Sequence, residues 1–523
     1  MSEALQLAGA IAAAGAAAAG LLVAEPRERR LALAGALALA AAVIVGQAWD
    51  GQLAELRSEP LRLALVLAVG AATIALLVAA LRRWRWALPL GAIAVLALRI
   101  PVDFGGDSVN LLVPLYAVIA AGVLAGLMAS ERDARAELPV PRALLLVLAT
   151  AVVVYALQAI YSNDVEFAAR NVAFFLVPFA ALFVLLAECE WTPRLLGAAL
   201  VVLAVEAIGF AAVAIAQQGL GELFWNDSLR ASNDFHFYFR SNSIFWDPNI
   251  FGRYLALALV VLCGALVFAR RPRDAAWLAA AVAFGWVGLL FSFSQTSFIA
   301  LLAGLLFLCA LRFSLRRTAV IAPLVVIAAV GAIFIGDTNN ESRDELAGRS
   351  SGHSTLIEGG LELAANRPLQ GYGSASFPIA FQEQEEIGPR RTTVSHNEPV
   401  TVAAEQGAIG VLIYLALLVM ALRTLFGGMR RIAPGLAPKR ARPPTSDGRP
   451  GAASAPEVAR IAVAAAFCAL LVHTIGYASY LSDPLSWTLL AIGSALAYRT
   501  AREAGSAAPC STARPAEPLR SGR

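Results

Sequence analysis

Residues 63–81 read "LALVLAVGAATIALLVAAL", a run without one charged side chain. A helix rises about 1.5 Å per residue, so a run of this length can cross a hydrocarbon layer about 30 Å thick. Similar runs recur along the 523-residue chain, which is 59% hydrophobic and 15% charged. Soluble domains have about 25% charged residues. We therefore predict an all-α polytopic integral membrane protein with about 12–15 transmembrane helices and two long external loops.

The apolar runs give the expected membrane helices. These are 4–24, 31–48, 61–81, 86–100, 111–129, 141–161, 167–187, 195–216, 250–269, 275–292, 295–311, 318–335, 400–422, 459–480 and 484–499. The stretch before the first run is "MSEALQLAG", which has an acidic residue and no basic one. A cleaved signal peptide begins with a positive region, so we expect the first helix to be retained.

The charges of the connecting loops predict their sides of the membrane. With the N-terminus outside, loops assigned inside include "EPRERR", "RRWR" and "ARRPRD", whereas "PVDFGGDSVN" and "YSNDVE" fall outside. Arginine and lysine concentrate in cytoplasmic loops, so this alternation supports the helix count and the orientation.

This orientation divides the chain into membrane, external and cytoplasmic parts. The parts are N-terminal membrane helices (1–216), external loop one (217–249), central membrane helices (250–335), a large external loop expected to hold the chemistry (336–398), a further helix (399–422), a disordered basic cytoplasmic linker (423–458), C-terminal membrane helices (459–500) and a disordered cytoplasmic tail (501–523). The linker and tail are expected to be disordered because they are rich in Pro, Gly and Ser.

Composition limits the partners and the cell type. The net charge of +4 is too small to indicate a nucleic-acid partner. Lys439 is the only lysine beside forty arginines, a bias typical of a GC-rich bacterial genome. The five cysteines show no CxxC or Cys/His spacing, so the sequence predicts no disulfide framework, metal site or cofactor.

Both external loops end with a proline in the first turn of the next helix. The first closes with "FYFRSNSIFWDPNIFGRYL" and the second with "TTVSHNEPVTVAAEQG". Pro248 follows Asp247, and Pro399 follows Asn397 by two residues, so an Asp or Asn is available to cap each helix. Two helix N-termini would then face the exterior, which suits an anion such as phosphate. The alternative interpretation is ordinary capping.

Arginines near these helix starts favour an anion site. Arg240 and Arg253 flank the first helix start, and Arg349 and Arg367 flank "SSGHSTLIEGGLELAAN" in the second loop. A guanidinium group suits phosphate oxygens. We therefore predict that these four arginines bind a phosphate-bearing ligand. The alternative is a salt bridge to an acid such as Glu405.

The sharpest candidate base is His396, at a helix start on the predicted outer face. An imidazole can accept a proton from a hydroxyl near neutral pH. Asn397 lies beside it, and Glu405 lies on the same helix face as Glu398, where it could orient a partner or pair with an arginine. We predict catalytic roles for His396, Asn397 and Glu405. His473 lies inside an apolar run and is expected to be a hydrogen-bonded core residue.

Four segments together resemble a known family. They are "HNEPVTVAAEQGAIGVLIYLALL", "NRPLQGYGSASF", "FRSNSIFWDPNIFGRYLAL" and "SFSQTSFIALLAGLL", spanning about 235–425. Their order and spacing resemble the O-antigen ligase and O-antigen polymerase-like membrane proteins. An arginine often found in the last segment of that family is Gln295 here.

The resemblance implies a metal-independent glycosyltransferase of the bacterial cytoplasmic membrane, with its active site on the external face. Such enzymes move a glycan from an undecaprenyl-diphosphate carrier to a hydroxyl of a glycan, lipid or protein acceptor. The resemblance therefore implies that the phosphate-bearing ligand of Arg240, Arg253, Arg349 and Arg367 is a diphosphate. The family histidine corresponds to His396, and its loop arginines to Arg240 and Arg349. Ligase, polymerase and protein O-oligosaccharyltransferase share these motifs, and other polysaccharide-assembly proteins are further partners that the resemblance allows.

Two different classes of protein compete with this interpretation. A transporter of a lipid-linked sugar or small anion also carries intramembrane charges. A transporter should show internal repeats and charges near the middle of the membrane. The sequence shows no clear repeat, and its charges gather at the predicted external edge. A purely structural or assembly protein would not need the arginine–histidine cluster.

Overall fold

The protein is described here from a computed structural model. It describes residues 2–49, 51–104, 107–129, 137–224, 229–230, 233, 238–324, 343–384, 395–436 and 453–506. The side chains of 101–104, 107–110 and 343–354 also lie outside the described part. Residues 437–452 of the predicted cytoplasmic linker, residues 507–523 of the predicted tail, and the predicted helix 318–335 beyond residue 324 fall outside it too.

The N-terminal elements form a helical bundle with one short β ribbon. They are α1 (Glu3–Leu22), α2 (Pro26–Ala48), α3 (Gln52–Ser58), α4 (Pro60–Arg83), α5 (Ala87–Val95), β1 (Ile100–Phe104), β2 (Asp107–Leu111), α6 (Val113–Leu127), α7 (Arg142–Gln158), the 3₁₀ turn η2 (Ala159–Tyr161), α8 (Val165–Asn171), the π-helical segment η3 (Val172–Leu176), α9 (Val177–Glu188) and α10 (Pro193–Leu220). The two strands are antiparallel.

The C-terminal elements are helical. They are α12 (Pro248–Val267), α13 (Pro272–Ser292), α14 (Gln295–Arg312), α16 (Arg343–Asn366), α17 (Phe377–Gln384), α18 (Glu398–Phe426), α19 (Met429–Ile432), the 3₁₀ turn η4 (Pro434–Leu436), α20 (Ala455–Gly476) and α21 (Pro484–Ser506). Helix α18 continues beyond 422 and α20 begins before 459, so helix reaches into both ends of the predicted linker.

The membrane helices confirm the predicted fold class. Within the described residues, 11 helices are long and apolar enough to cross a bilayer. The apolar α6 is shorter, with 15 residues, and α21 is less apolar although it has 23. The chain is therefore a polytopic all-α membrane protein, as the apolar runs predict.

The prediction of a membrane helix over 86–100 is wrong in its second half. Helix α5 has only 9 residues, and the chain then extends into β1. Nine residues rise only about 14 Å, which is less than half of a bilayer. Pro101 has no N–H to continue a helix and disfavours helical backbone in Ile100, so a helix could not continue through the end of the predicted range.

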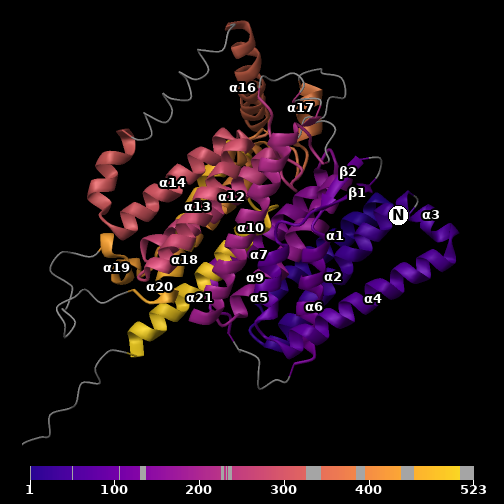
Figure 1. Cartoon of the computed structure of the whole chain (residues 1–523). Coiled ribbons are helices and arrows are strands. Elements are labelled where there is room, and N and C mark those ends of the chain that lie inside the picture. The colour runs from indigo at the N-terminus through magenta and orange to yellow at the C-terminus, as the bar shows by residue number, and fades with distance from the viewer. Residues whose placement is uncertain are drawn as a thin grey trace, which may run out of the picture.

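Elements from the loops gather at two ends of the molecule. Figure 1 shows α16 and α17 at the top and the β1–β2 ribbon at the upper right, with α19 at the left and the last turns of α21 at the lower left. The upper group comes from loops predicted outside, and the lower group follows helices predicted to end inside. The side of the membrane on which each group lies stays a prediction.

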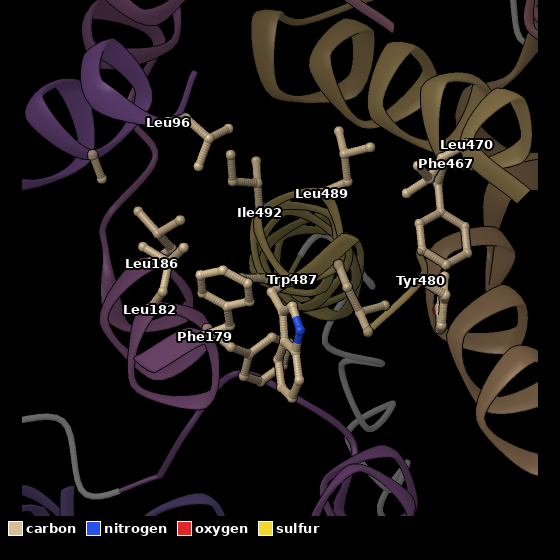
Figure 2. Close-up of a cluster of buried hydrophobic side chains, with 14 of the residues drawn as sticks. Leu96, Phe179, Leu182, Leu186, Phe467, Leu470, Tyr480, Trp487, Leu489 and Ile492 are labelled. Atoms are coloured by element: carbon tan, nitrogen blue, oxygen red, sulfur yellow. The ribbon is translucent and has the colours of Figure 1, made fainter. Parts of the chain in front are cut away.

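Helix α21 joins the two halves of the bundle. Figure 2 shows α21 end-on, with the apolar side chains of α9 on one side and those of α20 on the other. Trp487 is buried, its ring lies 6.3 Å from that of Phe183, and its indole N–H donates to the carbonyl of Leu481 at 2.8 Å. This packing fixes the start of α21, and with it the turn between α20 and α21.

Candidate functional site

The starts of α12 and α18 are capped as the sequence predicts. Asp247 accepts a hydrogen bond from the N–H of Asn249 at 2.6 Å, with proline in the first turn of α12. Asn397 accepts from the N–H of Val400 at 3.1 Å, again with proline in the first turn. The side-chain amide of Asn397 also donates to the carbonyl of Ile475 at 3.0 Å. Asn397 therefore ties α18 to the end of α20.

The two helix starts meet around Tyr477, in the turn after α20. Its ring centroid lies 6.1 Å from that of His396 and 6.0 Å from that of His473. The guanidinium carbon of Arg253 lies 5.5 Å from the same ring. Burial, and then the nearby Asp247 carboxylate, raise the pKa of the Tyr477 hydroxyl above its usual range. Two motifs far apart in the sequence thus converge on one side chain.

Arg253 is a buried ion-pair partner. Its side chain is 1% exposed, and its Nη2 lies 2.7 Å from Oδ2 of Asp483, which is 2% exposed. Nη1 donates to the carbonyl of Ser479 at 3.4 Å. Arg253 therefore pairs with the α20–α21 turn, and not with Glu405 as the alternative interpretation allowed. It can reach a ligand only if this pair opens.

Arg240 is half-buried and begins a polar track. Its Nε donates to the carbonyl of Ser292 at 3.3 Å, and its Nη2 donates to Oδ1 of Asn249 at 3.4 Å. Asn249 also accepts from the hydroxyl of Ser294 at 2.8 Å. Arg240 thus lies at the α12 start with only two of its five N–H groups engaged by described residues.

The polar track continues to His473. Ser294 and Ser297 share a hydrogen bond of 2.8 Å, and Ser297 lies 3.1 Å from Nε2 of His473. His473 is fully buried. The expectation that His473 is a hydrogen-bonded core residue is confirmed. Through this track, Arg240 is connected to the ring that packs against Tyr477.

His396 has a strained backbone. Its φ of 57° lies in the left-handed region, which non-glycine residues rarely adopt. Ser395 holds this conformation, because its hydroxyl donates to the carbonyl of Asn397, lies 2.9 Å from the Thr401 hydroxyl and accepts from the Asn397 N–H at 3.1 Å. Such strain clusters at functional sites, where surrounding contacts impose it. The half-buried imidazole is fixed at the start of α18.

Glu405 binds a loop and not an arginine. Its side chain is 6% exposed and accepts the backbone N–H groups of Ala375 at 2.9 Å and Phe377 at 3.2 Å. These groups belong to the segment "NRPLQGYGSASF", residues 366–377, and to the start of α17. A carboxylate at a helix N-terminus stabilises that end of the helix. Glu405 therefore holds the 366–377 segment against α18.

Helix α18 is broken at Gly407, and the same segment fills the break. Gly407 has φ 61° and ψ −160°, a conformation found essentially only for glycine. The carbonyl groups of Ala404 and Glu405 accept from Tyr372 and Gly373 at 3.0 and 2.8 Å, and the N–H of Ala408 donates to Pro368 at 2.8 Å. The unpaired backbone groups at membrane depth thereby gain partners.

The remaining predicted arginines lie away from Tyr477 or outside the described side chains. Arg367 is exposed at the end of α16, with its guanidinium carbon 4.2 Å from the centroid of the Tyr372 ring. Arg349 belongs to α16, but its side chain is outside the described part. The structure thus brings His396, Asn397 and Arg253 together, and connects Arg240 to them through hydrogen bonds.

The sequence interpretation missed residues of this cluster, including Arg99, Tyr477 and Asp483. Arg99 follows α5, and its Nε is buried without a hydrogen-bond partner among the described residues. Burial lowers the pKa of the Arg99 guanidinium, and the nearby Asp483 carboxylate opposes that shift. One signal was available: Asp483 precedes Pro484, the same Asp–Pro pair that begins α12. Within the described residues, no three His, Cys, Asp or Glu side chains gather as a metal site would require.

One family comparison matches the chain. Residues 258–415 match the family model described as O-antigen ligase, and no curated protein matches the chain. The matched part contains His396, Asn397 and Glu405, but it begins after Arg240 and Arg253. The resemblance predicted from the sequence is confirmed for this part of the chain.

Proposed function

Because this polytopic membrane protein carries an O-antigen ligase-like region, we propose that it transfers a glycan from an undecaprenyl-diphosphate carrier to an acceptor hydroxyl. The hydroxyl oxygen forms a bond to the anomeric carbon of the glycan. The bond between that carbon and the diphosphate oxygen breaks, and the diphosphate leaves with the electron pair. We propose the outer face of the bacterial cytoplasmic membrane as the site of this reaction.

The observation that carries the proposal is the meeting of the two helix starts around Tyr477. His396, from the matched part of the chain, and Arg253, from the preceding motif, both lie beside the Tyr477 ring. Arg240 is connected to that ring through hydrogen bonds and His473. An acid–base side chain and a source of positive charge are what glycan transfer from a diphosphate requires. The convergence supports a single reaction site at this end of the bundle.

In this proposal, Arg240 stabilises the departing diphosphate. Its guanidinium is half-buried at the N-terminus of α12, where the helix dipole also favours an anion. The Ser292 and Asn249 contacts orient the group and leave other N–H donors for phosphate oxygens. Arg253 keeps the α20–α21 turn in position through its ion pair with Asp483.

His396 accepts the proton of the attacking hydroxyl in the same step. The 395–397 segment fixes the ring at the helix start, so a hydroxyl arriving from the exterior would meet the imidazole before the membrane interior. Asn397 positions His396 by holding the α18 start to α20. Glu405 acts at greater distance by holding the 366–377 segment.

The broken helix α18 does not favour a transporter. In transporters, the free ends of broken membrane helices coordinate the substrate or ion. Here the backbone groups beside Gly407 bind the 366–377 segment. The side-chain amide of Gln158 donates a hydrogen bond to the carbonyl of Gln406 at 3.1 Å. The break thus anchors a loop.

The reaction is tested with the purified full chain in lipid nanodiscs. Purified undecaprenyl-diphosphate glycan and candidate hydroxyl acceptors are incubated with it in excess EDTA, and mass spectrometry follows both products. We expect a glycosylated acceptor and free undecaprenyl diphosphate, without added metal. Movement of intact donor across proteoliposome membranes with no bond cleavage would favour the transporter.

The proposed orientation is tested by cysteine labelling of a variant without native cysteines. Gln370 is exposed in the 366–377 segment, and Arg273 is exposed at the start of α13, in a loop predicted inside. In intact cells, a membrane-impermeant thiol reagent should label Gln370→Cys and not Arg273→Cys. The reverse pattern would move the reaction to the cytoplasmic face.

A further inference from the structure

A cavity lies beside the polar cluster, between α7, α8, η3 and α18. Its volume is about 370 Å³, and the α20–α21 turn closes one side of it. Its size is in the range of small-molecule sites, which is about 300–1,000 Å³. Neither His396 nor Arg240 lines it. It is therefore a separate chamber at the same end of the bundle.

The walls of this cavity change from polar to apolar along α18. Toward the helix start they carry Glu398, Thr401 and Glu405. Across from these lies Tyr155, whose hydroxyl accepts from the amide of Asn171 at 3.1 Å. Farther along, from Gly410 to Leu417, the wall is mainly apolar for about 10 Å of helix. The shape suits an amphiphile with a polar head and a hydrocarbon chain.

Two irregular stretches of helix face the cavity. Phe175 and Leu176 line it from the π-helical η3, and Gln406 lines it next to the break at Gly407. π-Helical turns are rare and are frequent at functional sites. Irregular backbone at membrane depth is tolerated where it is packed against protein or lines a cavity. Both irregularities are therefore consistent with a binding role for this chamber.

The side chains that line the cavity favour one of the two substrates. Its formally charged lining side chains are the acids Glu398 and Glu405. Glu398 lies near the backbone of Ser479 and Tyr480, and Glu405 accepts two backbone N–H groups, which fix its carboxylate in place. A carboxylate has about four acceptor positions, which leaves positions for hydroxyl donors. Carboxyl oxygens accept hydrogen bonds from the hydroxyl groups of a sugar, and among the described residues no cationic side chain lines the cavity to hold a diphosphate.

We propose that this cavity binds the acceptor, a neutral amphiphile with a hydroxyl-rich sugar head. The head lies against Glu398 and Glu405, and the hydrocarbon chain follows α18 from Gly410 to Leu417. The inference rests on the proposed function, because Glu398 follows His396 by two residues and so brings an acceptor hydroxyl to the base. Donor and acceptor would then bind at different positions, the donor diphosphate at Arg240 and the acceptor in the cavity.

Photolabelling tests the cavity without relying on glycan transfer. The probe is decyl β-glucoside with a diazirine in its chain, added to the full chain in nanodiscs. We expect labelled peptides from the cavity-lining parts of α7 and α18. Unlabelled decyl β-glucoside should compete at least about tenfold better than decyl phosphate, which has the same chain and a charged head. Equal competition by the two would contradict the proposal.

Variants of the lining and of a lipid-facing position sharpen this test. Ala151→Phe fills the cavity and should reduce labelling about tenfold, as should Tyr155→Phe with Tyr414→Phe, which keeps the rings but removes two hydroxyl groups. Val201→Phe adds the same ring on an exposed position of α10 and should leave labelling unchanged.

The two proposals fail in different ways. Labelling of wild type that is insensitive to both lining variants would overturn the cavity assignment, even if transfer is normal. Specific labelling without any glycan transfer would overturn the proposed function and the acceptor role of the ligand, while leaving a binding site for alkyl glycosides.

Discussion

The starts of α12 and α18 share a local pattern but use their ionisable side chains differently. Each has an Asx cap and a proline in the first turn. In α12, Arg253 is buried against Asp483, and the helix continues without interruption to Val267. In α18, Glu405 binds a loop, His396 sits in a left-handed conformation, and Gly407 breaks the helix.

The difference shows how one capping pattern serves two purposes. The α12 start is a rigid, charge-compensated support for Arg240, since its buried arginine has a carboxylate partner. The α18 start has an irregular backbone at His396 and Gly407, and contacts with other segments impose this conformation. Local sequence specifies the cap in both cases. The ionisable group near each cap contacts a segment that is distant in the sequence. That contact decides whether the group supports the fold or faces a substrate.

The largest expected effect is the loss of the base at the α18 start. His396→Asn should reduce glycan transfer about a hundred- to ten-thousand-fold, since asparagine cannot accept the proton. Asparagine tolerates the left-handed region better than alanine, so the variant should keep its fold. Transfer is measured at matched protein level. Near-wild-type transfer by His396→Asn would show that His396 is not the base in this reaction.

Breaking the ion pair between Arg253 and Asp483 should mainly lower the free energy of unfolding. Arg253→Met leaves Asp483 buried without its partner and should cost about 3–5 kcal/mol. Asp483→Asn keeps an acceptor for the N–H of Leu485, which Asp483 caps at 2.8 Å, so the double variant should regain part of the loss. The measurement is a double-mutant cycle of unfolding in detergent. A wild-type unfolding free energy in Arg253→Met would instead favour a ligand role for Arg253.

Replacing Arg240 separates charge from geometry at the same helix start. Arg240→Lys keeps the positive charge but loses the planar fork that contacts Ser292 and Asn249. Transfer should fall about a hundred- to a thousandfold, as when one donor to a developing anion is removed. Stability should change little, because the group is only half-buried. Full activity in Arg240→Lys and Arg240→Ala would exclude this residue from the diphosphate site.

The smallest effect is expected on the stability of the protein, from a substitution at the break in α18. Gly407→Ala places a methyl group in a conformation reserved for glycine, at a cost of about 1–3 kcal/mol, and its Cβ would lie 2.4 Å from the Leu369 carbonyl oxygen. The matched control is Gly209→Ala in α10, where no atom lies within 4 Å, and thermal unfolding compares the two. Equal midpoints would mean that the break is not required by the fold.

The sequence by itself determined the membrane class, the position of most helices and the two capped helix starts. These follow from local properties: the length of apolar runs, the missing N–H of proline and the reach of Asx side chains. The order of short motifs also sufficed to predict the O-antigen ligase resemblance that the family match confirms for residues 258–415. The same reasoning failed at α5, which ends before the apolar run does.

Only the tertiary structure decided what each polar side chain does. Nothing near Arg253 in the sequence indicates Asp483 as its partner, and nothing near Glu405 indicates the N–H groups of Ala375 and Phe377. A buried charge or broken helix in a membrane needs a partner, since water is absent there, but any distant segment can supply it. Which segment does so depends on how the whole bundle packs.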